Sequence, residues 1–140
     1  MIKDLTEFEQ IFELLEKNEL PTSDITQEKS IQFFGIFENE KLIACVGMEP
    51  MANVVLIRSL AVNHSQQGKG YGSKLVSHVE QRAKESAFGA IYLLTTTADQ
   101  YFLKHDYQKL PRNQAPHEIL SSSQFSHVCP ISAILMVKYL

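Results

Sequence analysis

Apolar and polar positions repeat with two periods along the 140 residues, and each period predicts a kind of element. Near the N-terminus, four apolar residues follow the i, i+3, i+4, i+7 spacing that lines one face of a helix: Phe8, Ile11, Phe12 and Leu15. Thr6 stands in capping position, with Glu9 three residues later. Pro21 is expected to end this helix, and the stretch after it, residues 21–30, is polar and irregular.

Three apolar runs of strand length follow, at residues 33–37, 41–48 and 53–62. Short polar turns join them, one at residues 38–40 and one at residues 51–53. Strands joined by turns this short run antiparallel, so we expect a three-stranded meander.

The second half of the chain begins with a helix that buries one side, through Leu75, Val76, Val79 and Ala83. Gly89 ends it, and residues 90–94 form the short apolar run typical of a buried parallel strand. A strand, a crossover helix and a second strand predict a right-handed βαβ unit.

The C-terminal third predicts shorter elements. Thr97 is expected to cap a helix over residues 98–105, and residues 107–110 read as an edge strand that Pro111 closes. A short helix over residues 116–122 and a last strand over residues 131–139 complete the chain. The pattern predicts an α/β fold, a mixed sheet with helices on both faces.

Composition narrows the class of protein. An apolar share of 44% suits one globular domain, expected to span residues 1–140, with no repeat or linker. A net charge of -3 argues against nucleic acid as a partner. No apolar run approaches the roughly 20 residues that span a bilayer, and the first residues do not show the basic-then-apolar pattern expected of a signal segment. Cys45 and Cys129 form no Cys-x-x-Cys pair, so we expect reduced thiols in a cytoplasmic protein without membrane contact.

The stretch between the third strand and the crossover helix carries the chemistry. Gly68, Gly70 and Gly72 stand at alternate positions directly before the helix. Glycine lets backbone N–H groups close around a ligand, and a helix N-terminus favours an anion, most often phosphate. Residues 60–73 therefore predict a strand, a phosphate-binding glycine loop and a helix. The alternative is a tight turn that binds nothing.

The spacing of the loop excludes two common phosphate motifs. A Walker loop, Gly-x-x-x-x-Gly-Lys-Ser/Thr, would need a glycine where this chain has Asn63 and a serine or threonine where it has Gly70. The dinucleotide fingerprint, Gly-x-Gly-x-x-Gly, would need its third glycine one residue after Gly72. The spacing that fits is Gln67-x-x-Gly70-x-Gly72. It resembles the acyl-CoA loop of the GNAT superfamily of N-acetyltransferases, and residues 58–62 and the following helix match that family too. The resemblance covers nearly the whole chain and is strongest over residues 33–107.

The resemblance implies the acyl-CoA N-acyltransferase fold, an α/β fold. It has a mixed, mostly antiparallel twisted sheet of six to seven strands flanked by helices on both faces. It also implies acetyl-CoA as the co-substrate, an amine as the acceptor, and direct attack within a ternary complex. The residues it assigns to the cofactor are Leu60, Ala61, Val62, Gln67, Gly68, Lys69, Gly70, Tyr71, Gly72 and Ser73. Among these, the backbone of Leu60 and Val62 would pair with the pantetheine arm, and the Val62 N–H would hold the oxyanion. Lys69 either adds charge near a phosphate or is a solvated loop lysine.

The acceptor side is assigned to three residues. The family often places a glutamate near the end of the second meander strand, where this chain has Glu49, as the base that deprotonates the amine. The alternative is a carboxylate in water. Arg58 is a charge inside an apolar strand and needs an anionic partner. One interpretation, which we favour, is that Arg58 binds a substrate carboxylate with its planar guanidinium, with help from Ser59. The other is that Arg58 forms an internal ion pair with Glu49.

The general acid departs from the family pattern. The family's tyrosine position holds Phe102, and Asp106 replaces the glycine that usually precedes the last aromatic residue of that motif. Tyr101 is offset by one residue, about 100° around the helix. Tyr101 is the candidate acid that we name; His105 and Cys129 are weaker candidates, and water alone is another source of the proton.

Residues 56–60, 93–98 and 125–133 resemble the arsenic-resistance branch of these enzymes, which is related to amino-acid N-acetyltransferases. A small, carboxylate-bearing amine is therefore the expected acceptor. The alternatives are acetylation of another amine (a polyamine or a protein N-terminus) and a non-catalytic, acyl-CoA-binding regulatory module. A homodimer is possible by analogy with the family. His127 and Cys129, separated by one residue and without a second pair, do not predict a metal site.

Overall fold

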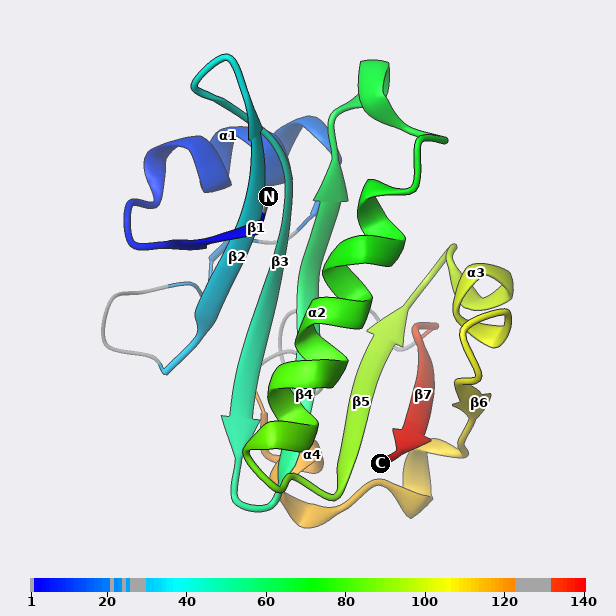
Figure 1. The fold of residues 1–140 in the computed structure, drawn as a ribbon. Helices are drawn as coiled ribbons and strands as arrows, with labels where there is room; N and C mark the ends of the chain where they lie inside the picture. The colour runs from blue at the N-terminus through cyan, green and yellow to red at the C-terminus, as the bar shows by residue number, and fades with distance from the viewer. Residues whose placement is uncertain (1, 21, 24, 26–29, 123–131) are drawn as a thin grey trace.

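The computed structural model describes residues 2–20, 22–23, 25, 30–122 and 132–140 (Figure 1). In this part of the chain, seven strands form one sheet in the order β1-β2-β3-β4-β5-β7-β6. The strands are β1 (Ile2–Leu5), β2 (Gln32–Glu38), β3 (Lys41–Met51), β4 (Val54–Val62), β5 (Ala90–Thr95), β6 (Gln108–Lys109) and β7 (Ile134–Tyr139). The helices are α1 (Glu9–Lys17), α2 (Tyr71–Glu85), α3 (Asp99–Leu103) and α4 (His117–Leu120), with 3-10 turns η1 (His64–Gln66) and η2 (Arg112–Gln114).

The predicted meander and crossover are confirmed. β2, β3 and β4 pair antiparallel, and the β2–β3 turn places Asn39 and Glu40 at φ 51° and 65°, the left-handed pair that a tight hairpin needs. β4 and β5 are the parallel pair, joined by α2. The fold class is therefore the one expected, a mixed and mostly antiparallel sheet with helices on both faces.

The two faces of the sheet carry different helices. Along β3, Val46 belongs to the apolar cluster that α2 covers, while its neighbour Cys45 belongs to the cluster that α1 covers. This alternation follows from the two-residue period of a strand. α4 packs on the same face as α1, in a third cluster around Ile119 and Leu56. The residues that α2 buries are the four expected: Leu75, Val76, Val79 and Ala83.

Two of the expected helix caps are wrong. α1 begins at Glu9 with Phe8 as its N-cap and no side-chain cap, because β1, which the pattern did not predict, keeps the chain extended to Leu5. Thr6 therefore lies in the connection between the two elements. α1 ends at Lys17, before Pro21, which lies outside the described residues.

α3 is shorter than expected and begins after Ala98. Its entry is held by the Thr95 hydroxyl, which accepts a hydrogen bond from the Ala98 amide at 2.9 Å, so Thr97 is not the cap. The expected edge strand and short helix are present as β6 and α4, and β7 begins at Ile134 rather than at 131.

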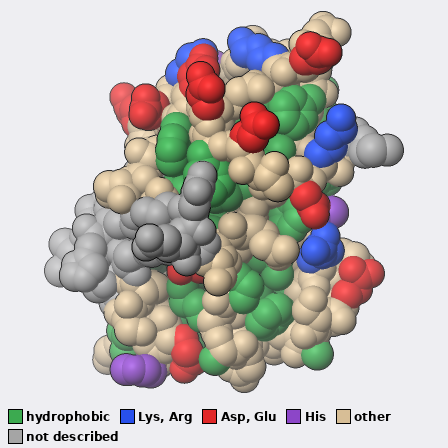
Figure 2. Space-filling model, turned by 90° about the vertical axis from the view of Figure 1, so that its left-hand side faces the viewer, with side chains coloured by type: hydrophobic (Ala, Val, Ile, Leu, Met, Phe, Trp, Pro, Cys, Tyr) green, Lys and Arg blue, Asp and Glu red, His purple; other side chains and the backbone are tan. Residues whose placement is uncertain are grey.

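On the face shown in Figure 2, acidic and basic side chains lie interspersed, and neither sign forms a continuous field. Among the described residues, no helix combines the length and the apolar character that crossing a bilayer requires.

Cys45 is a free thiol in the middle of the sheet, fully buried, with its Sγ 3.5 Å from the carbonyl oxygen of Ser59. Burial raises the pKa of this thiol to about 12. At pH 8 only about one Cys45 thiol in ten thousand is then ionised, and the thiolate is the reactive form.

We expect iodoacetamide to leave Cys45 unmodified in the folded protein and to label it after unfolding in urea, as mass spectrometry of the Cys45 peptide would report. Labelling at the same rate in both states would contradict this burial.

Candidate functional site

The central feature of the molecule is the divergence of its two parallel strands. β4 and β5 pair only from Val54 to Leu56 on one strand and from Ala90 to Tyr92 on the other. Beyond this point β4 stays paired with β3, and β5 stays paired with β7. Figure 1 shows the two strands diverging toward the loop before α2. A cleft of about 1020 Å³ lies between them, lined by the far halves of β4 and β5, the loop before α2, and α3.

A β-bulge in β4 sets the direction of the residues beside the cleft. Arg58 pairs with Gly47 and Ala61 pairs with Cys45, so two residues of β4, Ser59 and Leu60, oppose one residue of β3. Ser59 takes a left-handed conformation, with φ 56°, to fit the extra residue. The bulge moves the last residues of β4 into a new register with β3.

Past the bulge, the main chain of β4 presents polar groups to the cleft. The Asn63 amide donates to the Ile43 carbonyl at 2.7 Å, toward β3. Because backbone groups alternate in direction along a strand, the N–H groups of Val62 and Leu60 point the opposite way, toward the cleft. β5 does not pair with this part of β4, so these groups face the cleft without a strand partner.

The glycine loop, residues 67–73, stands at the upper end of the cleft. Gly68 and Gly70 take left-handed conformations, with φ 82° and 86°, and a Cβ added at either would meet no atom within 4 Å. The first helical bond of α2 runs from the Lys74 amide to the Gly70 carbonyl. In the described part of the structure, the amides of residues 68–73 have no acceptor. The loop therefore points a row of donors, and the positive end of a 15-residue helix, into open space.

Side chains anchor this loop. The Gln67 side-chain amide donates to the Val62 carbonyl at 3.2 Å, which ties the loop to the end of β4. Lys69 donates to the Gln66 side chain at 3.0 Å, and Gln66 in turn donates to Glu38 of the β2–β3 hairpin at 3.3 Å. The loop is thus held open with its donors exposed, an arrangement that fits a diphosphate.

Arg58 lines the cleft on the face of the sheet opposite α2. Its side chain has no exposed surface, and its Nη1 lies 3.2 Å from a carboxylate oxygen of Glu49, whose side chain is 14% exposed. Its Nε donates to the Ser59 hydroxyl at 3.3 Å. The internal ion pair that the sequence left open is therefore present. Glu49 is not among the described residues that line the cleft.

Gly47 makes the room for this arginine. A Cβ on Gly47 would lie 3.1 Å from Cγ of Arg58 and 3.1 Å from the Phe33 ring. Because Gly47 has no side chain, the Arg58 side chain can lie across β3 and reach Glu49. Sequence reasoning missed this residue, although a glycine inside a strand signals a close approach.

Tyr101 and Phe102 take different positions around α3. Both residues line the cleft, but Phe102 is buried in the apolar cluster under α2, whereas Tyr101 is only half-buried against that cluster. The Tyr101 hydroxyl lies 3.0 Å from the Ser73 hydroxyl, and a Cβ on Gly72 would lie 3.3 Å from it. Tyr101 thus stands beside the first turn of α2. Its role as the acid stays a prediction, as do the roles predicted for Glu49, Arg58 and Ser59.

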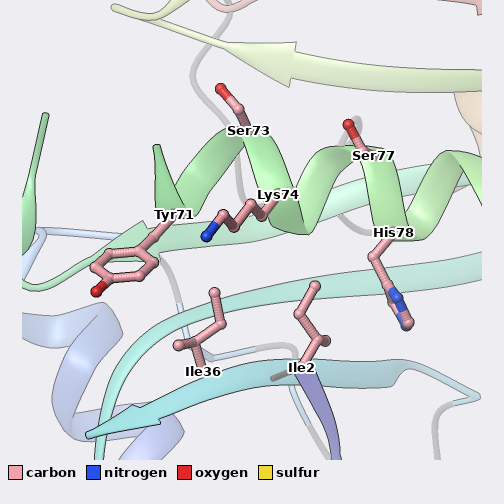
Figure 3. Close-up of a pocket in the computed structure, with 7 residues that line it drawn as sticks. All are labelled: Ile2, Ile36, Tyr71, Ser73, Lys74, Ser77 and His78. Carbon is pink, nitrogen blue, oxygen red and sulfur yellow. The ribbon is translucent and has the colours of Figure 1, made fainter. Parts of the chain in front are cut away.

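A second hollow, of about 740 Å³, lies on the other side of α2, above Ile2 and Ile36 (Figure 3). His78 lines it, and its ring meets the Phe34 ring edge to face, with ring centroids 4.7 Å apart and the ring planes at 69°. Burial and the nearby Arg82 charge lower the pKa of His78, so this ring is neutral near pH 7.

Among the described residues, no group of three or more His, Cys, Asp or Glu side chains could hold a metal ion. His127 and Cys129, named at the sequence level, lie outside the described residues.

Comparison with known proteins agrees with this geometry. The profile of the family described as "Acetyltransferase (GNAT) family" matches residues 2–110. The amino-acid acetyltransferase of Pseudomonas paraeruginosa is 32% identical over 84 residues, which cover 58% of this chain and 19% of that protein. That of Ralstonia nicotianae is 29% identical over 94 residues, covering 65% and 21%. The chain thus spans about a fifth of the length of these curated relatives.

Solved structures share the fold at low sequence identity. N-acetylglutamate synthase from Neisseria gonorrhoeae, complexed with coenzyme A and N-acetyl-glutamate, superposes with a TM-score of 0.78 at 17% identity, over 100% of this chain and 35% of that one. Tetrahymena GCN5 superposes with a TM-score of 0.75 at 18% identity, over 99% and 95%. The diverging strands, the glycine loop and the match over most of the chain lead to one assignment: this protein belongs to the GNAT family of acetyltransferases.

Proposed function

We propose that this protein transfers the acetyl group of acetyl-CoA to the primary amine of a small, carboxylate-bearing acceptor, by direct attack within a ternary complex. One observation carries the proposal. The same cleft is lined by the unpaired edge of β4 and by Gly68 and residues 70–73, whose amides have no acceptor in the described part of the structure. A long ligand with an anionic diphosphate and an amide-containing arm satisfies both sets of groups. The coenzyme A named in the N-acetylglutamate synthase structure is a ligand of that kind.

The chain's own residues bind such a cofactor in two places. The amides of the glycine loop, in the first turn of α2 and before it, hold the diphosphate. The N–H groups of Leu60 and Val62 hold the pantetheine arm, and that of Val62 stabilises the oxyanion that develops on the carbonyl. When bound, the cofactor supplies an activated acetyl thioester. Holding it beside the amine contributes about 7–11 kcal/mol to lowering the barrier.

Arg58 is the residue that we assign to the carboxylate of the acceptor. It borders the cleft, lies on the face away from α2, and carries a planar cation that suits a carboxylate. Glu49 holds it in place at 3.2 Å and is also the base that we propose for the amine, directly or through water. The name "amino-acid acetyltransferase" of the curated relatives supports an acceptor with both an amine and a carboxylate.

The thiolate that leaves takes its proton from water or from the Tyr101 hydroxyl, which borders the cleft. Phe102, buried among apolar residues, offers no proton.

The acceptor class is tested by measuring the release of CoA thiol from acetyl-CoA with panels of amino acids, polyamines and short peptides. We expect turnover with amino acids or close analogues. Turnover with polyamines or peptide N-termini alone would contradict the carboxylate-bearing class. Binding of CoA with no turnover on any amine would indicate a regulatory module.

Replacement of Arg58 tests the carboxylate contact. We expect Arg58→Ala to raise the KM of the acceptor by roughly ten- to a hundredfold, because a charge-assisted pair is lost, and to change the KM of acetyl-CoA much less. Arg58→Lys keeps the charge without the fork and should lie between the two, which also covers the case where the alanine variant folds poorly. Equal effects on both KM values would count against this assignment.

Replacement of Gly70 tests the cofactor loop. Gly70→Val places a branched side chain where the diphosphate would lie, so we expect CoA affinity to fall by at least tenfold in isothermal titration. Asn39→Val is the matched control, since it strains a left-handed residue (φ 51°) in the β2–β3 turn, away from the cleft. Unchanged CoA affinity in Gly70→Val, or equal losses in both variants, would refute the role of the loop.

A further inference from the structure

Three polar side chains from separate segments meet beside the first turn of α2. The Ser73 hydroxyl lies 3.0 Å from the Tyr101 hydroxyl and 3.2 Å from Nε2 of His105. The Tyr101 and His105 rings lie against each other, with centroids 4.6 Å apart. All three side chains are half-buried. We refer to Tyr101, Ser73 and His105 as the hydroxyl–imidazole chain.

The hydroxyl–imidazole chain borders the cleft through two of its three members, and one of these, Ser73, also lines the groove on the other side of α2. Ser73 and Tyr101 both line the cleft between β4 and β5. In Figure 3, Ser73 points away from Ile2 and Ile36, the residues at the base of the groove. The Tyr101 hydroxyl lies within 3.3 Å of the position that a Cβ on Gly72 would take, so it stands next to the free amides of the glycine loop.

A second set of contacts holds in place the segment that contributes Tyr101 and His105 to the hydroxyl–imidazole chain. Glu80, seven residues after Ser73 on α2, accepts a hydrogen bond from the Tyr107 hydroxyl at 3.0 Å and one from Lys138 at 3.2 Å. Lys138 also donates to the backbone carbonyl of His105 at 3.2 Å. The segment from Tyr101 to Tyr107 is therefore attached to α2 at both ends, which holds its polar atoms in place.

The number of hydrogens that each group can donate gives the hydrogen bonds of the hydroxyl–imidazole chain a direction. A serine or tyrosine hydroxyl donates once, and the Nε2 of histidine donates when it carries the proton. With Nε2 protonated, His105 donates to Ser73 and Ser73 donates to Tyr101. The Tyr101 hydrogen then remains for an acceptor in the cleft. The imidazole of His105 thus sets which way the Tyr101 hydroxyl donates.

We propose that the hydroxyl–imidazole chain is the side-chain part of the cofactor's diphosphate site: Tyr101 donates to a phosphate oxygen, and His105, acting through Ser73, positions that hydrogen. This inference rests on the proposed function for the identity of the cofactor. The location of the hydroxyl, against the first turn of α2, assigns it to the anionic end of the cofactor. Of the two proton sources proposed for the departing thiolate, this arrangement leaves water.

The test uses Tyr101→Phe and His105→Ala with two thioesters, acetyl-CoA and acetyl-pantetheine, the second of which lacks the diphosphate. Both variants should weaken CoA binding by roughly tenfold in isothermal titration, since Tyr101→Phe removes a hydrogen bond to the charged phosphate and His105→Ala removes the hydrogen bond that orients it. They should lower kcat/KM for acetyl-CoA by the same factor, through KM, and leave kcat/KM for acetyl-pantetheine unchanged. The double variant should lose no more affinity than either single one, because His105 acts through Tyr101.

Two matched variants complete the experiment. His105→Gln keeps a donor at about the position of Nε2 and should restore CoA affinity, which a merely structural role would not require. Replacement of His117, an exposed histidine on α4, by alanine should leave CoA affinity unchanged.

Equal losses of kcat with both thioesters would overturn the proposal in favour of thiolate protonation. Full CoA affinity in Tyr101→Phe would also overturn it. Because titration with CoA needs no turnover, the proposal is tested even if no acceptor reacts, whereas a wild-type protein that binds no CoA would refute the proposed function and this inference together.

Discussion

The parting of β4 from β5 after three paired residues is the constraint on which the rest of the structure depends. A buried strand edge normally pairs its backbone groups, because an unpaired amide in an apolar setting is costly. Here the edge of β4 from Leu60 to Val62 borders a cleft, so its groups are solvated or met by a ligand. The bulge at Ser59 adds to this, since it moves the last residues of β4 into a new register with β3. The glycine loop directly follows this part of β4 and therefore lines the same cleft.

The second constraint is a charge inside the sheet. Arg58 has a fully buried side chain, which is tolerated because Glu49, Ser59 and the gap at Gly47 give the guanidinium both partners and room. The pair stands on the face opposite α2, whereas the glycine loop leads into α2. The two halves of the proposed reaction, cofactor and acceptor, therefore approach the diverging strands from opposite sides of the sheet. Such an arrangement favours a ternary complex.

Local patterns predicted much of this molecule. The period of α2 gave its four buried residues, the short turns gave the meander, and the spacing Gln67-x-x-Gly70-x-Gly72 identified the loop, because each of these depends on residues close in the chain. The expected caps at Thr6 and Thr97 were wrong because strand pairing by β1 and the hydroxyl of Thr95 decided where the helices begin. The bulge at Ser59, the role of Gly47 and the meeting of Ser73 with His105 were beyond sequence reasoning, since they arise only when distant segments pack together.

The central claim is that the main chain of residues 68–73, together with Leu60 and Val62, binds the cofactor. The most direct measurement is a titration of the ¹⁵N-labelled protein with CoA, followed amide by amide in NMR spectra. The account predicts that the largest shifts fall on the amides of the glycine loop and on those of Leu60 and Val62. Saturable binding with those amides unmoved, and with shifts centred on another surface such as the groove above Ile2 and Ile36, would contradict it.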